Sequence, residues 1–479
     1  MRKRFEIQLE LGTTPIEEIE IPTKSRDELP PVLRALQYIY IKPEINEKVF
    51  KIIEKRINRY KNGRPGLTLW EILVLGAVRL TLDVNYDRLE HIANYDSIVR
   101  ELLGVKSTGF QKLKKYSLTS LKENVSKIDD EILEEINEVV VKQGHRIKKK
   151  EGEKIRVKID SYVLESTVHF PTDINLLLDS GRKIIETLEK IIEEVSIEGW
   201  RKSKHWKRSL KNLSRTIGRI SRGGGKQKEK RIKQEVKKYL RTARVIKEKL
   251  SKSKEEILGI TNNIKIIGLL ESLRYYEQML QKHIDLVERR IIKGEKIPHE
   301  EKVFSIFEPY TEWIQKGKSG KAVELGLKIA VGTDQYGFIL THKVMKKQQD
   351  VEVAVPMVKK IKEQYDVESV SFDKGFWSPS NKEQIEKMIE IVVMPKKGKL
   401  NKQDSENERS KTFRQLRNQH SAIESNINSL EHHGLNRCPD KGLKNFKKYT
   451  ALGILSYNLH LLGKLLIDES KTARYKKAA

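Results

Sequence analysis

The 479-residue sequence contains a single cysteine, Cys438, and it lacks any long apolar run. One cysteine excludes an intramolecular disulfide and a cysteine-based zinc site, and it fits a reducing compartment such as the cytoplasm. Without about 18 consecutive apolar residues, no membrane-spanning helix is expected. The basic start MRKRFEIQLELG is not followed by an apolar segment, so no signal peptide is expected. The pattern G-x-x-x-x-G-K-S/T is also missing, so ATP use is not expected.

Acidic residues are the minority among the charged ones. The chain has 67 Asp and Glu against 95 Lys and Arg, a net charge of +28. Such an excess predicts a polyanionic partner, either nucleic acid or an anionic membrane. Because neither a membrane segment nor an export signal is expected, we favour double-stranded DNA, no membrane partner, and a cytoplasmic, nucleoid-associated protein.

The length suits two to four domains. We expect an N-terminal region over residues 1–62 and a helical domain over 63–150. Thr68 and Glu71 have the spacing of a capping box at the start of an amphipathic helix. Short helices ahead of a sheet suggest a helix-turn-helix-like DNA-binding module. The alternative is a small helical bundle with no role in DNA binding.

Two more helices are predicted within the 63–150 domain. One covers about 86–103 and ends at Gly104, and the next covers about 130–143 and stops at Gly144. Glycine commonly follows the last residue of a helix because it adopts the left-handed conformation without steric cost.

A sheet domain is predicted over 151–172 and 321–470. The segment 155–169 is rich in β-branched residues that alternate with polar ones, and strand patterns return at 323–334 and 337–345 and in VESVSFD, which ends at Asp373. Helices alternate with the later strands, so we expect an α/β fold, a mixed sheet flanked by helices. A long helical insertion, 173–320, separates the first strand from the others.

The basic residues are concentrated in the insertion. Residues 201–250 contain 20 Lys or Arg and 3 acidic residues, a net charge of +17. Gly223-Gly224-Gly225 breaks this segment. Such a helical insertion suits contact with the phosphate backbone, and Lys207, Arg208 and Lys211 are the candidate DNA-binding residues. The alternative is a solvated charged face.

Three carboxylates form the candidate catalytic site. Asp160 lies in the first strand, Asp373 ends a later strand, and Glu424 lies in a helix after the last strand. Cleavage and joining of phosphodiesters use two Mg²⁺ ions, which take oxygen ligands that converge from separate elements. Taken singly, each residue is equally well explained as a turn, a cap or a helix-face acid. Their joint placement on two strands and a helix favours a metal site.

Several stretches carry a resemblance to a known family. They are GRPGLTLWEILVLGAVRLTLDVNYDRLEHIANYDSIVRELLG, KIDSYVLESTVHFPTD, FEPYTEWIQKGK, VELGLKIAVGTDQYGFILTHKVM, SFDKGFWSPSN, VMPKKGKL and FRQLRNQHSAIESNINSLEHHGLNRCPDKGL. In these stretches the chain resembles bacterial insertion-sequence transposases of the DDE class, ISNCY-type group. Residues 1–60 and the basic insertion carry little of the resemblance.

The resemblance implies an RNase H-like catalytic core. It also implies metal-dependent DNA cleavage and strand transfer at the ends of a mobile element. Asp160, Asp373 and Glu424 match the catalytic triad, with Mg²⁺ as cofactor and Mn²⁺ as a substitute. A homodimer or higher oligomer on transposon ends and target DNA is implied as well.

The helix around Glu424 departs from the pattern of some related transposases, which carry Tyr, Arg, Glu and Lys there. Arg417 and His420 stand before Glu424, and Glu431 replaces the Lys. Arg417 and His420 share a helical face with Glu424, so they are candidates for DNA contact or for orienting it, with a surface role as the alternative. Glu431 is the fallback for Glu424.

Two further readings stay open. One is an RNase H-like nuclease that cuts DNA without joining it. The other is a basic DNA-binding protein whose acids are purely structural.

Near the insertion, Glu308 and Trp313 are candidates for DNA contact, with core packing favoured for Trp313. Asp173 is interpreted as part of a helix cap.

Overall fold

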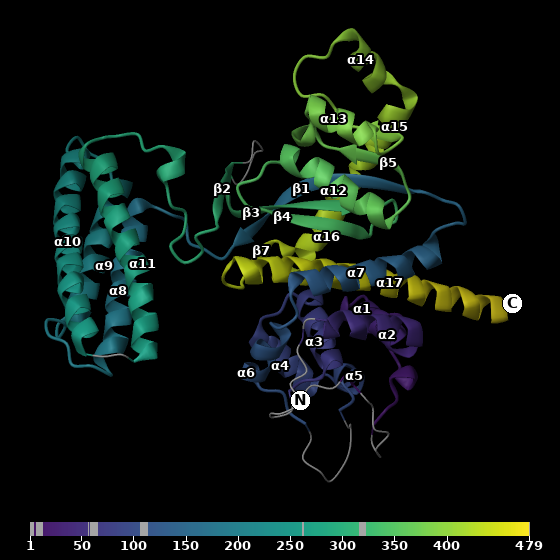
Figure 1. The fold of residues 1–479 in the computed structure, drawn as a ribbon, viewed down its shortest axis with the longest axis horizontal. Coiled ribbons are helices and arrows are strands. Elements are labelled where there is room, and N and C mark those ends of the chain that lie inside the picture. The colour runs from purple at the N-terminus through teal and green to yellow at the C-terminus, as the bar shows by residue number, and fades with distance from the viewer. Residues whose placement is uncertain are drawn as a thin grey trace. The chain divides into compact units, whose positions relative to one another are not determined.

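The computed structural model describes residues 4–5, 13–55, 57, 66–105, 114–260, 263–315 and 322–478, apart from the side chains of 260 and 473–478. The chain divides into two compact units. The first joins Met1–Thr167 with Ile314–Ala479, and the second is Val168–Trp313 (Figure 1).

Helices dominate the first unit, and the strands of one sheet lie among them (Figure 1). Its helices are η1 (Ile16–Glu18), α1 (Leu29–Ile41), α2 (Pro43–Glu54), α3 (Leu69–Thr81), α4 (Tyr86–Tyr95), α5 (Ser97–Leu102), α6 (Leu118–Val125), α7 (Asp130–Lys148), α12 (Asp350–Gln364), η4 (Lys374–Phe376), α13 (Pro379–Glu386), α14 (Lys402–Arg409), α15 (Lys411–His420), α16 (Ala422–Leu430), η5 (Glu431–Leu435) and α17 (Leu443–Ala478). The strands are β1 (Ile155–Ser166), β2 (Glu312–Gln315), β3 (Val323–Thr333), β4 (Ile339–Met345), β5 (Val367–Phe372), β6 (Ile391–Val393) and β7 (Arg437–Cys438).

The sheet is mixed and seven-stranded, which confirms the predicted α/β class. Its main order is β2-β3-β1-β5-β6, with β4 paired to β3 and β7 paired to β1. Strand β1 is central, antiparallel to β3 and parallel to β5, and β5 is parallel to β6. Helix α13 lies in the connection between the parallel neighbours β5 and β6, and the connection from β1 to β5 includes the helical bundle, β2 to β4 and α12.

Strand β1 forms where β-branched residues alternate with polar ones. Ile155, Val157 and Ile159 are buried, whereas Lys158 and Asp160 are only partly buried. Burial of each such aliphatic side chain stabilises the fold by roughly 1.5–3 kcal/mol. The alternation therefore places Asp160 on the opposite face of the strand from this apolar set.

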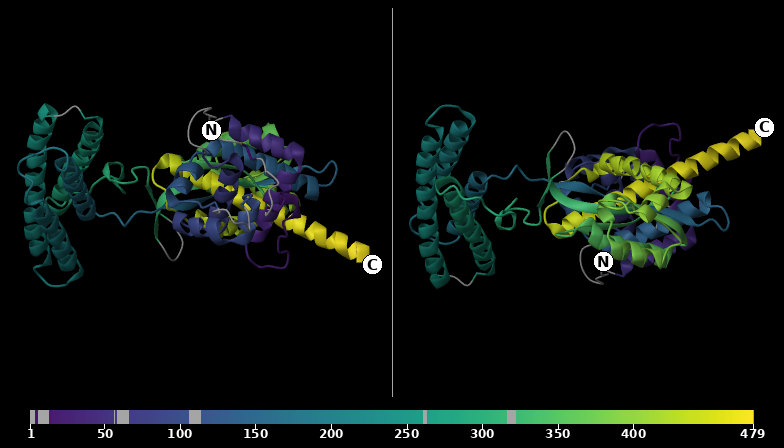
Figure 2. Two further views of the ribbon diagram at one scale, coloured as in Figure 1. Left: turned by 90° about the horizontal axis from the view of Figure 1, so that it is seen from below. Right: turned by 90° about the horizontal axis from the view of Figure 1, so that it is seen from above.

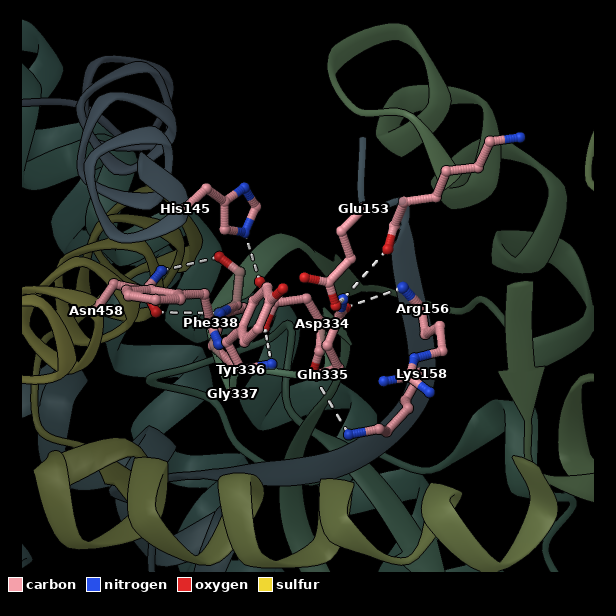
Figure 3. A network of polar contacts seen from close by, with 12 residues as sticks. His145, Glu153, Arg156, Lys158, Asp334, Gln335, Tyr336, Gly337, Phe338 and Asn458 are labelled. Carbon is pink, nitrogen blue, oxygen red and sulfur yellow. Dashed lines mark hydrogen bonds and ion pairs between the residues drawn. The ribbon is translucent and has the colours of Figure 1, made fainter. Parts of the chain in front are cut away.

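The turn between β3 and β4 is organised by the buried side chain of Asp334 (Figure 3). Its Oδ1 accepts hydrogen bonds of 2.8 and 2.9 Å from two backbone N–H groups of the turn, and its Oδ2 lies 2.6 Å from His145 Nε2 on α7. Asn458 on α17 accepts a bond from the N–H of Ile339 and donates one to its carbonyl, at 3.0 and 2.9 Å. Side chains from two helices thus hold the hairpin in place.

Helix α3 begins at the predicted capping box. The Thr68 side chain accepts from the N–H of Glu71, and the Glu71 carboxylate accepts from the N–H of Thr68. All thirteen residues of α3 are buried, and the helix packs against α17. A helix buried on every side has no face to place in a DNA groove. Helix α3 is therefore not a recognition helix, and the helix-turn-helix-like module expected over 63–150 stays a prediction.

Helix α7 also packs against α17 and β4. Residues 63–150, which we expected to form a domain of their own, consequently belong to the same compact unit as the sheet.

Two helix boundaries differ from the predictions. The helix expected over 86–103 is broken at Asp96, whose side chain accepts from the N–H of Val99 and caps α5. Helix α7 continues through Gly144 to Lys148. A Cβ atom at Gly144 would fall 2.1 Å from the ring of Phe338, so this glycine permits close packing and does not end the helix.

Helix α17 is, over Leu443–Thr472, long and apolar enough to cross a membrane by length and composition alone. However, 83% of its most apolar window is buried inside the protein, as expected for the core helix of a soluble protein. Glycine at position 463 fits this packing, because a Cβ there would fall 1.7 Å from the carbonyl oxygen of Pro31.

The second unit is a helical bundle, whose long helices lie side by side in Figure 2. Its core includes Trp200 and Tyr239, which donate hydrogen bonds to Ser253 Oγ and to the Ile174 carbonyl at 2.7 and 3.0 Å. The elements are α8 (Asp173–Ile192), α9 (Ser203–Arg222), α10 (Lys228–Ile260), α11 (Ile264–Val287), η2 (Glu288–Ile292) and η3 (His299–Glu301).

Candidate active site beside strands β1 and β5

Asp160 and Asp373 follow neighbouring positions of two parallel strands. Ile159 on β1 is paired with Phe372 on β5, and the next residue of each strand is the aspartate. Asp160 is partly buried at the centre of the sheet, whereas Asp373 is exposed just before η4. The sheet register therefore brings two of the three predicted carboxylates to the same end of the β1–β5 pair.

Glu424 comes from a separate element. It lies in the first turn of α16, which packs against β1, and its side chain is exposed. Ser421 separates two helices in this region, because it is the C-cap of α15 and the N-cap of α16.

The three carboxylates interact electrostatically. Burial, together with the negative charges of Asp373, Asp350 and Glu424, raises the pKa of Asp160 to about 6. A 2.7 Å hydrogen bond from the N–H of Ser161 to Asp160 Oδ1 acts in the opposite direction. Asp160 is thus the most buried member of a group of like charges, the arrangement that most strongly disfavours ionisation.

Asp350 is a fourth carboxylate that the sequence analysis missed. It is the first residue of α12, and its Oδ1 accepts a 2.7 Å bond from the Ser161 hydroxyl. Its Oδ2 accepts from Lys328 Nζ at 2.9 Å and would lie 3.2 Å from a Cβ placed on Gly375. Acidic residues are common in first helical turns because they stabilise the helix. The sequence therefore contained no signal that Asp350 would join the other carboxylates.

His420 lies at the end of α15, with its Nδ1 3.0 Å from Ser371 Oγ on β5. Burial lowers the pKa of His420 to about 4; the charge of Asp373 opposes this shift, and that of Lys158 adds to it. The ring is therefore neutral near pH 7. A neutral imidazole can donate or accept a hydrogen bond, but it carries no positive charge that could attract a phosphate. The predicted contact of His420 with DNA is therefore limited to hydrogen bonding.

Arg417 and Glu431 have different surroundings from His420. Arg417 is exposed and its guanidinium lies 3.7 Å from the Glu408 carboxylate, so its predicted contact with DNA stays a prediction.

Glu431 begins η5 and its charge adds to the effect of burial in raising the pKa of Tyr162. Glu424 is among the charges that act on Asp160.

The chemistry of the donor set fits Mg²⁺, because all four groups are carboxylates and Mg²⁺ takes oxygen ligands. A divalent cation would also relieve the repulsion that raises the pKa of Asp160. Within the described residues, no three His, Cys, Asp or Glu side chains are grouped closely enough to hold a metal ion as they stand. Convergence on a metal therefore stays a prediction.

The candidate DNA-binding residues of the insertion lie on α9 in the second unit. Arg208 and Lys211 are exposed. Lys207 is about 29% exposed and its Nζ lies 2.7 Å from the Glu189 carboxylate on α8. Its charge is thus partly neutralised within the bundle, in contrast to those of Arg208 and Lys211.

Trp313 lies beside two aromatic side chains. Its ring centroid lies 5.7 Å from that of Phe304 and 5.4 Å from that of Phe170. Trp313 is only partly buried and Phe170 is 60% exposed, so the core packing favoured from sequence stays a prediction. Glu308 is buried, with only 5% of its surface exposed, so direct contact with DNA would require its neighbours to move.

The cap of α8 is made by the residue that precedes Asp173. The Thr172 side chain accepts from the N–H of Asn175 at 3.1 Å. Asp173 is the first helical residue, and it forms an ion pair of 2.9 Å with Arg290.

Comparisons with family models, curated proteins and solved structures find no match to this chain. Function is therefore argued from the site alone.

Proposed function

We propose that the chain is a DNA transposase of the DDE class, with Asp160, Asp373 and Glu424 as its catalytic carboxylates. The observation that carries the proposal is the register of β1 and β5, which brings Asp160 and Asp373 to the same end of the strand pair, while Glu424 lies on α16, which packs against β1. The raised pKa of Asp160, caused first by burial and then by nearby negative charges that include Asp373 and Glu424, supports the proposal. Perturbed, mutually repelling acids in a partly buried position are typical of functional sites.

The sheet supports the finer assignment to an RNase H-like core. The antiparallel hairpin of β3 and β4 lies on one side of β1, and the parallel strands β5 and β6 lie on the other. A mixed sheet of this kind brings acids at the ends of adjacent parallel strands together, which is the placement that phosphoryl transfer requires of its ligands.

Each carboxylate has a distinct role in the proposal. Asp160 would be the central ligand because it is the most buried, and Asp373 and Glu424 would be the outer ones. Ser161 donates to Asp350 through its hydroxyl and to Asp160 through its N–H, so it positions both acids. When bound, two Mg²⁺ ions supply an activated oxygen nucleophile and stabilise the leaving oxygen.

DNA binding is proposed for the basic residues outside this site. Arg208 and Lys211 on α9 have exposed cationic side chains that suit phosphate contact without sequence preference. Sequence-specific recognition of transposon ends, assembly of a homodimer or larger oligomer on DNA, and association with the nucleoid are further parts of the proposal.

The test is a cleavage and joining assay with the purified full chain. The substrate is the DNA that flanks the reading frame, including any inverted repeats, incubated with Mg²⁺ or Mn²⁺. Asp160→Asn, Asp373→Asn and Glu424→Gln each remove a charge with little change of shape. Asp366→Asn is the matched control, because this exposed aspartate precedes β5, at the end of the strand opposite Asp373.

The proposal expects cleaved and joined products from the wild type and from the control, and none from the three variants. DNA binding in a gel-shift assay should stay close to wild type. Cleavage without joined products would instead favour the nuclease. Absence of any metal-dependent cleavage, with DNA binding intact, would favour a non-enzymatic DNA-binding protein.

A further inference from the structure

A cavity of about 510 Å³ lies in the first unit, away from the carboxylates of the proposed active site. Helices α3, α6 and α17 and the segment after β7 contribute to its wall. The volume falls within the range of small-molecule sites, about 300–1,000 Å³. None of Asp160, Asp350, Asp373 and Glu424 is among its lining residues.

The wall of this cavity is cationic. It contains Arg79, Lys122, Lys441 and Lys448, and Asp440 is its one carboxylate. Within the described part of the chain, Lys122 and Lys441 form no ion pair and are exposed. Lys122 and Lys441 thus place two positive charges on this concave surface that have no ion-pair partner among the described residues.

Lys448 shows the effect of this crowding. Its Nζ donates a 2.7 Å hydrogen bond to the Ser126 carbonyl. Burial lowers the pKa of Lys448 and the charge of Lys444 adds to this shift, while the charges of Asp440, Asp130 and Asp129 oppose it. A bound anion would offset both effects, because it would place a negative charge beside a partly desolvated ammonium group.

Arg79 is the buried member of the group, with 4% of its side chain exposed. It makes two bonds to the Asp440 carboxylate, at 2.7 and 3.1 Å, and its guanidinium carbon lies 4.0 Å from the centre of the Tyr86 ring. Among the described residues, its buried Nε–H has no hydrogen-bond partner. Such a donor is costly to leave unpaired, so it is suited to an incoming acceptor.

The rest of the wall is apolar or aromatic. Val125, Ile128 and Leu452 line it, together with the rings of Tyr86 and Tyr449. A ligand that fits must therefore combine a strongly anionic group with a compact apolar or planar part. A nucleotide has this combination, since its phosphate carries close to two negative charges and its base is flat.

We propose that this cavity binds a nucleotide through its phosphate group. The lysines hold the phosphate by charge-assisted hydrogen bonds, and the apolar wall accommodates the base. A free nucleotide carries a phosphate monoester with close to two negative charges, and a nucleotide within DNA carries a phosphodiester with one. Both present phosphate oxygens and a flat base, so the test must separate these two sources.

The experiment measures binding to the full chain by calorimetry, with dAMP, inorganic phosphate and a short DNA duplex as probes. The cavity variant is Lys122→Gln with Lys441→Gln. The matched control is Lys359→Gln with Lys402→Gln, which removes the same charge from exposed positions of α12 and α14 that do not line the cavity. Both variants avoid the buried Arg79–Asp440 pair, whose loss would risk unfolding.

A free nucleotide site predicts that dAMP binds the wild type and the control alike, and that the cavity variant binds it at least about tenfold more weakly. A site for nucleotides of DNA predicts a greater loss of duplex affinity in the cavity variant than in the control, with competition by dAMP. Equal affinities of the two variants for all three probes would overturn the proposal. None of these measurements depends on DNA cleavage, so the proposed active site is tested separately.

Discussion

The sheet unit and the helical bundle treat charge in opposite ways. In the bundle, basic side chains are numerous, and several are paired with acids, as in Lys207 with Glu189, Lys254 with Glu277 and Arg289 with Glu301. In the sheet unit, Asp160 is partly buried beside like charges, and its pKa rises to about 6. Basic residues are thus concentrated in the bundle, whereas the sheet unit holds Asp160 among several like charges.

This difference indicates where function is most readily sought. A charge that has a partner contributes little beyond solubility and a modest gain in stability. A charge held among like charges persists only where the surrounding structure tolerates its cost, and such sites are enriched in catalytic groups. The variants below test whether the two units differ in this way.

The largest expected effect is on catalysis. Asp160→Asn, Asp373→Asn and Glu424→Gln should each reduce cleavage by roughly 10³-fold or more, the scale of losing a principal charge-stabilising group in phosphoryl transfer. Single-turnover cleavage rates measure the loss. A residual rate close to wild type in any one variant would remove that residue from the site. For Glu424, the same substitution at Glu431 then decides between the two.

A large effect on stability is expected from Asp334. Asp334→Ala leaves His145 and two backbone N–H groups of the β3–β4 turn without their buried acceptor. Each buried donor left without its acceptor costs about 1–3 kcal/mol in the free energy of unfolding, so the loss of all three should total at least about 3 kcal/mol. Urea denaturation measures this loss. Asp468→Ala is the control, because its 73% exposed side chain should contribute less than about 0.5 kcal/mol. Equal losses would contradict the contrast between buried and exposed charges.

A smaller effect on the free energy of unfolding is expected from replacing Asp160, and this replacement should stabilise the protein. Its folded-state pKa of about 6 lies above the ordinary 3.8, so the folded protein binds more protons between these values. Stability attributable to Asp160 therefore falls as pH rises from about 4 to about 6. Asp160→Asn should remove this dependence and stabilise the protein at pH 7 by roughly 1–3 kcal/mol.

The measurement for Asp160 is the difference in unfolding free energy between wild type and variant at about pH 5 and pH 7. The variant's advantage should be larger at the higher pH. A difference that does not change with pH would show that burial and the neighbouring charges do not raise the pKa of Asp160.

The smallest effect is expected in the bundle. Neutralising Lys207, Arg208 and Lys211 together should reduce the salt slope of DNA binding by about 2 and not 3, because Lys207 is already paired with Glu189. Glu189→Gln frees Lys207 and should raise the slope slightly. Fluorescence titrations at several salt concentrations measure both. An unchanged slope in the triple variant would show that this face of α9 is only solvated.

Sequence alone determined the features that depend on a few neighbouring residues. The capping box of Thr68 and Glu71, the strand around Asp160 and the strand that ends before Asp373 were all predicted, and the structure confirms these elements. Caps and alternation are local because they involve hydrogen bonds and side-chain directions within about one turn or one strand. The mixed α/β class followed from the order of such elements.

Only the tertiary structure decided which residues meet across long distances in the chain. Asp350 comes beside Ser161 because α12 starts next to the sheet, and Phe338 occupies the space that makes glycine necessary at position 144. Lys207 meets Glu189 only because α8 and α9 pack side by side. Packing and charge compensation depend on these distant neighbours. Local patterns therefore predicted where the acids lie along the strands, but the packed sheet and helices determined which charges surround them.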